Sequence, residues 1–477
     1  MVTHAACAPQ EAAPPLPRDG LPEGFRIGFD SRLRRLDGGR TLLGGAPTRL
    51  LRLTPAGAAA VDRWAAGSTP TGEAERALAR RLVTAGLAHP LPPAGPLPPG
   101  SVTVVIPVRD RAAQLARCLD ALHPCGARTI VVDDGSRDAA AIGRAAAAAG
   151  AEVIRHAQAR GPAAARNSGL DRSETPLVAF VDSDCVPEAG WLERLAAHFA
   201  DPSLAAVAPR IVAAPPARQS WLARYEADRS PLDMGARPGA VGPARPVPYV
   251  PSAALLVRRA ALEGGFDDHL RVGEDVDLAW RLHDTGWTVR YDPAVIVAHE
   301  HRETLGPWLR QRFAYGTSAA ALAERHPEKL PAIVLSPWSA ATFALLAARR
   351  PRAATTAAML GTMTVRVRLG RSLPPAVSTR LTADVLAWTT RSLSVALTRN
   401  WLPLSLAAAV TSRRARRGLA LAGLLARAPE LRRETQRLPL PLALTLGTAD
   451  DAAYAAGLWS GCIRHRCPAP LLPALRR

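Results

Sequence analysis

"LVAFVDSDCVP", residues 177–187, joins an unbroken apolar run to two aspartates, Asp182 and Asp184. Five consecutive apolar residues are typical of a strand that is buried on both faces, as in a parallel sheet covered by helices. Ligands of such sheets bind beyond the carboxyl ends of the strands. The stretch therefore predicts a buried strand that carries both carboxylates to the ligand-binding edge of an α/β fold.

The neighbouring segments alternate between β-rich and helical patterns. The β-rich runs are VTVVI (102–106), TIVVD (129–133), EVIRH (152–156) and LVAFV (177–181). The helical patterns cover 110–122, 138–149, 162–172 and 187–200. Because strands that alternate with helices at this spacing are typical of βαβ units, we expect a parallel sheet with helices on its faces.

The sequence after residue 200 predicts the remainder of this domain. Residues 213–248 are rich in Pro, Gly and Arg and are expected to form a long loop. A second apolar run (249–257) leads to VGEDVDLAWRLHDTG (272–286), which predicts a helix that ends at Gly286. Two strands are expected next, in WTVRYDP and AVIVAH (287–299), followed by basic helices.

The first hundred residues predict a separate small domain. Asp37-Gly38-Gly39 indicates a hairpin turn, and Thr54 is expected to cap a helix that ends at Gly67. A second helix is expected over 72–86, and the proline-rich segment 91–100 predicts a stiff linker. The expected division is 1–20 disordered, 21–90 a small α+β domain, 91–100 a linker, 101–304 the α/β domain and 305–477 a basic helical region.

Charge is distributed unevenly along the 477 residues. Residues 302–477 contain 26 of the 60 Lys and Arg residues and 8 of the 41 Asp and Glu residues, a net charge of +18. Residues 1–301 contain 34 basic and 33 acidic residues, so the basic surplus belongs to the last third. The six cysteines form no Cys-x-x-Cys pair, and no basic start followed by an apolar core opens the chain, so we expect a reducing cytosol.

Acidic residues follow the predicted strands where a dinucleotide-binding fold would have glycines. No Gly-x-Gly-x-x-Gly follows the first strand, which instead continues as IPVRDR, and the second continues as VVDDGSRD. Carboxylates at these positions suit hydrogen bonds to a base or a ribose. A bound diphosphate then needs another counter-charge, which a divalent cation supplies. Asp182 and Asp184 are the expected carboxylate ligands of that cation.

Five segments in this order resemble the family 2 glycosyltransferases, inverting nucleotide-sugar enzymes of the GT-A fold. They are VTVVIPVRDR, VVDDGSRD, GPAAARNSGL, FVDSDC and VGEDVDLAWRL, and they cover residues 101 to about 300. The resemblance implies that Asp110 and Asp134 contact uridine, that Asp182 contacts the donor ribose or sugar, and that Asp184 binds Mn²⁺ or Mg²⁺ on the diphosphate. The implied donor-binding residues are Pro107, Arg109, Asp110, Asp133, Asp134, Arg166, Asn167 and Asp182, and the implied metal ligands are Asp184, Asp182 and His299.

The same resemblance implies that Glu274 and Asp275 open the acceptor site. Inversion requires a base that removes the proton of the attacking hydroxyl, and Asp275 is the implied base. Acidic residues at this helix start also complement the helix dipole, and both roles can hold together; without the upstream motifs the structural role would be favoured. For His299, a histidine that faces solvent is the alternative to a metal ligand.

The N-terminal segment resembles the small peptide-chaperone domains of the PqqD type, which bind peptides at a sheet edge. A winged-helix accessory domain is the alternative. Joined to the transferase motifs, this segment makes the chain resemble the mycofactocin-system glycosyltransferases of actinobacteria. That resemblance implies transfer of glucose from UDP-glucose, in β-1,4-linked oligomers, to the peptide-derived redox cofactor mycofactocin or its precursor. A lipid-linked or cell-wall acceptor is the alternative, and a non-catalytic peptide adaptor is disfavoured by the intact aspartates.

The basic last third predicts attachment to the cytoplasmic face of the cell membrane. Residues 330–348 carry no charge, but their prolines make them a marginal transmembrane span. Amphipathic helices on anionic lipid, anchored by clusters such as RRARR (413–417), explain the segregated charge better. A true span and a basic helical bundle in solution remain as alternatives. Nucleic-acid binding is not expected, because residues 1–90 are not notably basic and aromatic residues make up only 5% of the chain.

Overall fold

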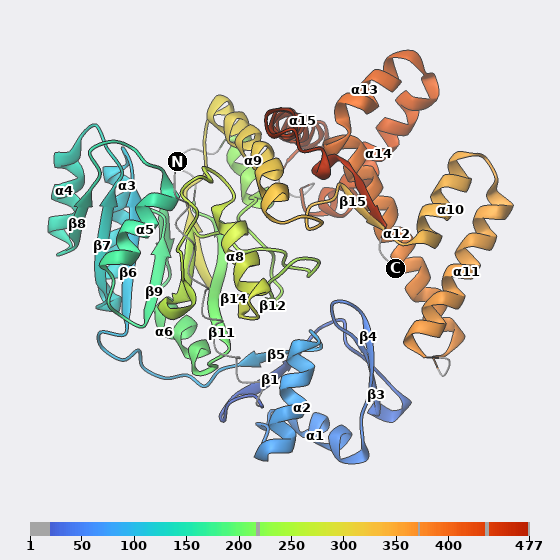
Figure 1. The fold of residues 1–477 in the computed structure, drawn as a ribbon, viewed down its shortest axis with the longest axis horizontal. Helices are drawn as coiled ribbons and strands as arrows, with labels where there is room; N and C mark the ends of the chain where they lie inside the picture. The colour runs from blue at the N-terminus through green and yellow to red at the C-terminus, as the bar shows by residue number, and fades with distance from the viewer. Residues whose placement is uncertain (1–19, 216–219, 371–372, 435–437, 476–477) are drawn as a thin grey trace, which may run out of the picture.

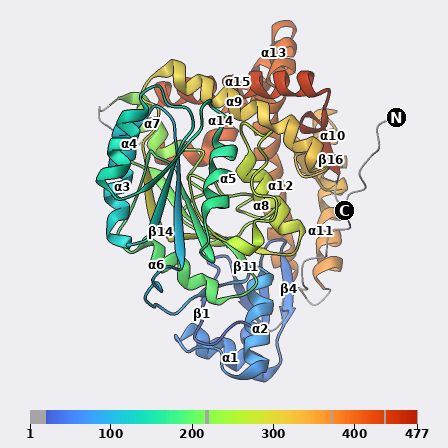
Figure 2. The same cartoon turned by 60° about the vertical axis from the view of Figure 1, so that its left-hand side comes forward.

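The computed structural model describes residues 20–215, 220–370, 373–434 and 438–475. These residues form an N-terminal module, a central α/β domain and a C-terminal helical region (Figures 1 and 2). The predicted disorder of residues 1–20 lies outside the described residues, except for Gly20.

The N-terminal module combines a small antiparallel sheet with two helices. Its elements are β1 (Arg26–Phe29), β2 (Arg34–Leu36), β3 (Thr41–Gly44), β4 (Arg49–Arg52), α1 (Pro55–Ala65), α2 (Gly72–Thr84) and β5 (Ala88–Leu91). The sheet order is β2-β3-β4, and β1 pairs with β5. The expected turn at Asp37-Gly38-Gly39 joins β2 to β3, with positive φ at all three residues. Thr54 caps α1 as expected, since its side chain accepts a hydrogen bond from the Gly57 N–H.

The central domain is built on a nine-stranded sheet. Its strands are β6 (Val102–Val108), β7 (Arg128–Asp133), β8 (Glu152–Arg155), β9 (Leu177–Val181), β10 (Cys185–Pro187), β11 (Leu204–Ala213), β12 (Gly239–Ala240), β13 (Ala254–Arg258) and β14 (Thr288–His299). The order is β10-β14-β11-β13-β9-β6-β7-β8, with β12 paired to β14. The four strands predicted from the alternating pattern are parallel neighbours, as expected.

The sheet as a whole is mixed, although the four strands for which a parallel arrangement was expected are parallel. β13 runs antiparallel to both β9 and β11, and β10 runs antiparallel to β14. The first four residues of β13, Ala254 to Val257, are nonetheless apolar and buried, because both faces of the sheet are covered at this position. An unbroken apolar run indicates that a strand is buried on both faces, but it does not indicate whether the strand is parallel or antiparallel to its neighbours.

Helices cover both faces of this sheet. They are α3 (Ala112–Leu122), α4 (Ala139–Ala148), α5 (Pro162–Arg172), α6 (Trp191–Ala196), α7 (Trp221–Arg229) and α8 (Glu274–Asp284). Leu115 of α3 packs with Val104 in one core cluster, whereas Leu170 of α5 packs with Val105 in the other. Adjacent residues of β6 thus enter different cores, as the two-residue period of a strand requires.

Two sequence-based expectations for this domain need correction, and one strand was not expected. The expected loop 213–248 contains α7 and β12, and the two expected strands of 287–299 form the single strand β14. β11 was not predicted. α7 is stabilised by packing from a distant part of the chain, because its Tyr225 makes an edge-to-face contact with Trp308.

The C-terminal region is helical, as expected. Its elements are α9 (Leu305–Arg325), β15 (Ile333–Leu335), α10 (Pro337–Ala347), α11 (Pro351–Leu369), α12 (Pro375–Val395), α13 (Leu402–Thr411), α14 (Arg413–Glu434), α15 (Leu440–His465) and β16 (Pro473–Leu475). The uncharged stretch 330–348 is divided between β15 and the 11-residue helix α10, so it does not form one spanning helix. Within the described residues no single helix has the length and hydropathy of a membrane span, although the pair Pro375–Asn400 and Leu402–Thr411, bent by 86°, passes that test together.

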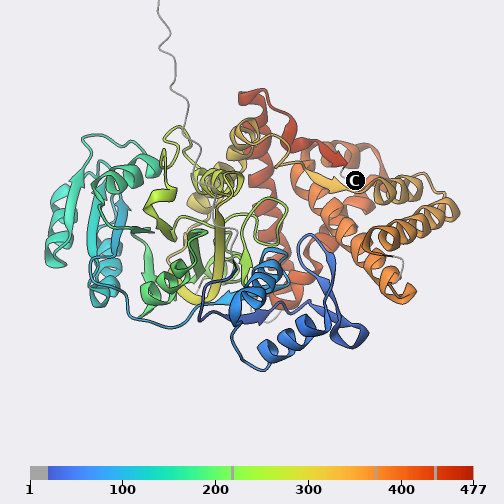
Figure 3. The same ribbon diagram turned by 60° about the horizontal axis from the view of Figure 1, so that its bottom comes forward.

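The N-terminal module packs against the central domain and faces α11 and α12 (Figures 1 and 3). Arg80 of α2 donates two hydrogen bonds to the Asp201 carboxylate, at 2.6 and 2.9 Å. Asp201 precedes β11, which runs in the same direction as β9, whereas Asp182 follows β9. The module therefore contacts the end of the sheet opposite the predicted ligand edge.

Candidate functional site

A cavity of about 380 Å³ lies at the carboxyl ends of β6, β7 and β9. This volume is within the usual range for small-molecule sites, roughly 300–1,000 Å³. Six residues predicted to bind the donor or the metal line it: Pro107, Arg109, Asp134, Arg166, Asp182 and Asp184. Because β6, β7 and β9 are parallel, the loops that follow them meet at one edge and bring these residues together.

Asp134 is fixed at the back of this cavity by three donors. Its carboxylate accepts hydrogen bonds from the N–H groups of Arg160 and Gly161, at 2.8 and 2.9 Å, and contacts His156 Nδ1 at 2.8 Å. Burial opposes ionisation of Asp134, but these donors outweigh it and hold the pKa of the carboxyl below its usual value. The carboxylate is therefore a permanent acceptor in the cavity.

Asp110 and Asp133 do not line the cavity, and their contacts shape the turns around it. Asp110 adopts a left-handed conformation (φ 56°) and accepts a hydrogen bond from the Arg137 N–H at 2.7 Å. The buried Asp133 accepts from the Ser136 N–H at 2.9 Å and pairs with Arg155. Both aspartates thus join the loop after β7 to its neighbours.

Arg166 connects the end of β9 to the start of α8. Its guanidinium donates to Asp182 Oδ1 at 2.7 Å and to Glu274 Oε1 at 2.8 Å, and it lies 5.5 Å from the centre of the Phe266 ring. Burial disfavours this charge, but the carboxylates of Asp182 and Glu274 raise the pKa of Arg166 above its usual value. The predicted donor and acceptor residues are therefore linked through one buried cation.

Asn167, the neighbour of Arg166, holds a turn before α8. Its Nδ2 donates to the Phe266 carbonyl at 2.8 Å and to Asp268 at 2.6 Å, and its Oδ1 accepts from the Phe266 N–H at 2.8 Å. A Cβ on Gly265 would lie 2.4 Å from that Oδ1. Asn167 does not line the cavity, and its contacts are those of a residue that positions this turn.

Asp184 and His299 lie close together. His299 ends β14, where it pairs with Cys185, and its Nε2 is 3.5 Å from Asp184 Oδ1. Asp184 Oδ2 is paired with Arg111, while Asp182 is turned toward Arg166. His299 is buried, so it does not face solvent. Among the described residues no group of three or more His, Cys, Asp and Glu side chains is arranged to hold a metal ion.

Glu274 and Asp275 begin α8, directly after Gly273 in a left-handed conformation. Burial and the adjacent Glu274 carboxylate raise the pKa of Asp275 to about 7, although the N–H of Val276 and the charge of Arg166 oppose the shift. Asp275 keeps partial contact with solvent, whereas Glu274 is buried. A carboxylate with a pKa near neutrality that can be reached from outside is suited to general-base catalysis.

Arg111 and Arg271 also line the cavity, although neither is among the predicted site residues. With Arg109 and Arg166 they place four guanidinium groups beside three carboxylates. Such a surface can bind a doubly charged diphosphate while the carboxylates contact neutral hydroxyl and base groups. The segment VRDR contains Arg111, but arginine is common throughout this chain. The presence of an arginine at this position therefore did not predict a role in the site.

Comparison with known proteins agrees with this geometry. The model of glycosyl transferase family 2 matches residues 103–266. A pre-mycofactocin glycosyltransferase of Mycobacterium tuberculosis is 42% identical over 96% of this chain and 99% of its own length. Glycosyltransferase AglE of Haloferax volcanii is 29% identical over 45% of this chain and 71% of its own.

Solved structures include distant similarities. The mannosyltransferase PcManGT of Pyrobaculum calidifontis, in complex with GDP-Man and Mn²⁺, is 18% identical, with a TM-score of 0.44, and covers 77% of this chain and 90% of its own. The glucosyl-3-phosphoglycerate synthase of Mycobacterium tuberculosis, in complex with Mn²⁺, UDP and glucosyl-3-phosphoglycerate, is 19% identical, with a TM-score of 0.34, and covers 47% and 79%.

Proposed function

Since this chain belongs to the family 2 glycosyltransferases and has their GT-A fold, we propose that it transfers glucose from UDP-glucose to pre-mycofactocin with inversion. Successive transfers build a β-1,4-linked glucan on the peptide-derived acceptor. The observation that carries this proposal is the 42% identity to a pre-mycofactocin glycosyltransferase along nearly the full length of both chains. The predicted base next to the donor cavity supports the reaction type.

In the proposed reaction Asp275 removes the proton of an acceptor hydroxyl as its oxygen attacks the anomeric carbon. The bond from that carbon to the diphosphate breaks on the opposite face, and its electron pair leaves with UDP. Arg166 holds Asp182 on the donor side and Glu274, the neighbour of Asp275, on the acceptor side. One buried cation therefore positions residues of both sides. Arg109, Arg111 and Arg271 line the cavity and bind the diphosphate in this proposal.

A divalent cation, Mn²⁺ or Mg²⁺, fits the residues at the diphosphate end only in part. Asp184 and His299 would hold it, and the diphosphate oxygens would complete its coordination. When bound, the cation supplies positive charge that stabilises the leaving diphosphate. The ion pair of Arg111 with Asp184 occupies one carboxylate oxygen of this set.

The N-terminal module and the C-terminal helices extend the proposal beyond the catalytic domain. We propose a PqqD-like, peptide-binding role for the module, and its small sheet supports this, because β2 and β4 pair with no further strand among the described residues. We also propose that the C-terminal helices lie on the cytoplasmic face of the membrane. Exposed apolar side chains support this location, among them Met359, Leu360 and Met363 of α11 and Val410 beside the arginines that begin α14.

The function is tested with the full-length protein, UDP-glucose, Mn²⁺ or Mg²⁺ and purified pre-mycofactocin, with hexose addition followed by mass spectrometry. We expect glucose addition by the wild type and none by Asp275→Asn, whose fold is checked by circular dichroism. GDP-mannose serves as the control donor. Glucose transfer to a lipid-linked acceptor but not to pre-mycofactocin would favour the alternative acceptor.

A further inference from the structure

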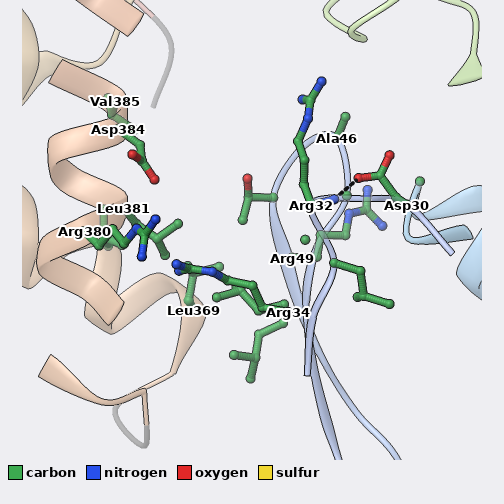
Figure 4. Close-up of a pocket in the computed structure, with 18 of the residues that line it drawn as sticks. Asp30, Arg32, Arg34, Ala46, Arg49, Leu369, Arg380, Leu381, Asp384 and Val385 are labelled. Carbon is green, nitrogen blue, oxygen red and sulfur yellow. Dashed lines mark hydrogen bonds between the residues drawn. The ribbon is translucent and has the colours of Figure 1, made fainter. Parts of the chain in front are cut away.

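A cleft of about 1,100 Å³ separates the N-terminal module from α11 and α12 (Figure 4). One wall consists of the residues around β2, the turn between β3 and β4, and the start of β4. The other wall consists of residues of α11 and α12, namely Val365, Arg368, Leu369, Arg380, Leu381, Asp384, Val385 and Trp388, and Gly86 and Pro246 complete the lining. The cleft shares no lining residue with the donor cavity, which lies at the opposite end of the central sheet.

The outer face of the small sheet lines this cleft, with Leu50 partly exposed and Leu43 covered. Arg34, Leu43 and Leu50 pair across β2, β3 and β4 and therefore lie on one face. Their neighbour Leu42 belongs to the core of the module, so this row faces away from that core. The facing helices contribute Val365, Leu369, Leu381, Val385 and Trp388.

Positive charge dominates the polar groups of the cleft. Five arginines line it, Arg32, Arg34, Arg49, Arg368 and Arg380, against two aspartates, Asp30 and Asp384. Asp30 is already engaged by His89, at 3.4 Å, and by the Arg32 N–H, at 2.9 Å. Within the described part of the chain, none of the five guanidinium groups has a carboxylate oxygen within 4.0 Å.

Arg34 of β2 and Arg380 of α12 point toward one another across the cleft (Figure 4). Two like charges that face each other without a counter-ion repel, and an anion between them removes the repulsion. The five arginines come from four separate segments of the chain, so they suit negative charges spread along a ligand better than a single phosphate. The apolar side chains of the cleft, Leu50 and those of α11 and α12, favour a ligand that also carries hydrophobic groups.

We propose that this cleft binds an acidic peptide segment that carries apolar side chains between its carboxylates. A bilayer surface does not fit, because it cannot enter a recess closed by protein on two sides. A single-stranded nucleic acid is disfavoured, because Trp388 is the one aromatic side chain among the lining residues and base stacking needs several platforms. Apolar and charged side chains are both present along the walls of the cleft. They match an extended peptide, because successive side chains of such a peptide point to opposite sides.

The inference rests on the proposed function in one respect: the bound segment belongs to the peptide-derived acceptor or to the protein that delivers it. A peptide held in the cleft leaves the donor cavity open. An acceptor group joined to that peptide by a segment long enough to span the central sheet is then held at a raised effective concentration at the donor cavity. In this proposal the N-terminal module and the helices α11 and α12 together bind the peptide that carries the acceptor.

Binding is measured by fluorescence anisotropy on the full-length protein. The probe is a labelled twelve-residue peptide in which Glu and Asp alternate with Leu and Val, and its comparison is the same peptide with Gln and Asn in place of the acids. We expect the acidic peptide to bind roughly tenfold more tightly than the neutral one at low salt, and to weaken as salt rises. Hydrogen exchange should show protection by the acidic peptide of amides in 43–50 and 365–388.

The decisive variant is Arg34→Glu combined with Arg380→Glu, which should lower the affinity for the acidic peptide at least about tenfold. The matched control, Arg40→Glu with Arg352→Glu, makes the same change in net charge at exposed positions outside the cleft and should bind like the wild type. Thermal unfolding and UDP-glucose hydrolysis are followed in both, and we expect neither to change.

Equal affinity for the two peptides, or unchanged binding by the double variant, would overturn the proposal. Phosphatidylserine vesicles that bind the wild type but not the double variant, together with no peptide binding, would make a lipid the occupant and would also overturn it. Peptide binding without any sugar transfer would contradict the proposed function and leave the cleft assignment intact. Sugar transfer without peptide binding would contradict the cleft assignment and leave the proposed function intact.

Discussion

Asp275 is the residue on which the proposed chemistry depends. Its pKa of about 7 means that the carboxyl is largely protonated in mildly acidic solution and cannot accept a proton there. We expect kcat/KM for sugar transfer to fall about tenfold for each pH unit below this pKa. Steady-state UDP release, measured from about pH 5.5 to about pH 8.5, tests this.

Two variants sharpen the pH test. Glu274→Gln removes a negative charge that raises the pKa of Asp275, so its activity profile should shift to lower pH. Asp284→Asn, at the far end of α8, should leave the midpoint of the profile unchanged. A wild-type profile that stays flat across this range would place the base elsewhere.

The same shift predicts a stability difference. The folded state binds the Asp275 proton more tightly than the unfolded chain, whose carboxyl has the ordinary value of 3.8, so folding loses stability as pH rises from about 4 to 7. Asp275→Asn is neutral at every pH. We expect this variant to resist urea better than the wild type above pH 7, by at most about 4 kcal/mol, and the difference to vanish near pH 4. A less stable variant at high pH would contradict the raised pKa.

Arg166 is the residue that joins donor and acceptor sides. Arg166→Lys keeps the charge but loses the planar group that contacts Asp182 and Glu274 together. We expect a loss of about 3 kcal/mol in stability, as for breaking a buried ion pair, and a fall in kcat/KM of more than about tenfold. Arg172→Lys, exposed on the same helix, is the control and should behave like the wild type. Wild-type activity in Arg166→Lys would show that only the positive charge at this position matters, and that the simultaneous contact with Asp182 and Glu274 does not.

At the scale of elements, α9 and α15 pack through glycines. A Cβ on Gly457 would lie 2.0 Å from the Phe313 carbonyl oxygen, and one on Gly461 would lie 2.6 Å from that of Thr317. These oxygens belong to the backbone of α9 and cannot move without shifting the helix. The close approach of the two helices therefore depends on the absence of side chains.

Gly457→Ala should accordingly lower the free energy of unfolding by about 1–3 kcal/mol, despite the higher helix propensity of Ala. Gly418→Ala in α14, where a Cβ meets nothing within 4 Å, should instead raise stability by up to about 1 kcal/mol. Urea denaturation of both variants tests the prediction. Equal effects of the two substitutions would mean that α9 and α15 are not in close contact.

At the scale of the whole molecule, the ion pair between Arg80 and Asp201 fixes the N-terminal module on the central sheet. Arg80→Ala leaves a buried carboxylate without its bidentate partner and should loosen this contact. We expect faster proteolytic cleavage within residues 92–100 and unchanged UDP-glucose hydrolysis. Arg81→Ala, at the exposed neighbouring position, is the control. Unchanged cleavage in Arg80→Ala would show that other contacts suffice.

The sequence by itself determined the local elements and their ligand edge. The strands at 102–106, 129–133 and 177–181 follow from apolar runs, and the cap at Thr54 follows from side chains that act on their own neighbours. The carboxylates after these strands reach one cavity because parallel strands end together, so Asp134, Asp182 and Asp184 could be placed in advance.

Only the tertiary structure decided which strands run antiparallel, that α7 forms within an expected loop, and that Arg166 bridges Asp182 to Glu274. It also decided that Asp133 and Asn167 hold turns, and that five arginines from two regions surround one cleft. Each of these features joins residues that are distant in the chain. A local pattern can show that a segment will be buried or that a side chain will be charged. Which distant residue it contacts depends on how the whole chain packs, and local patterns do not specify that.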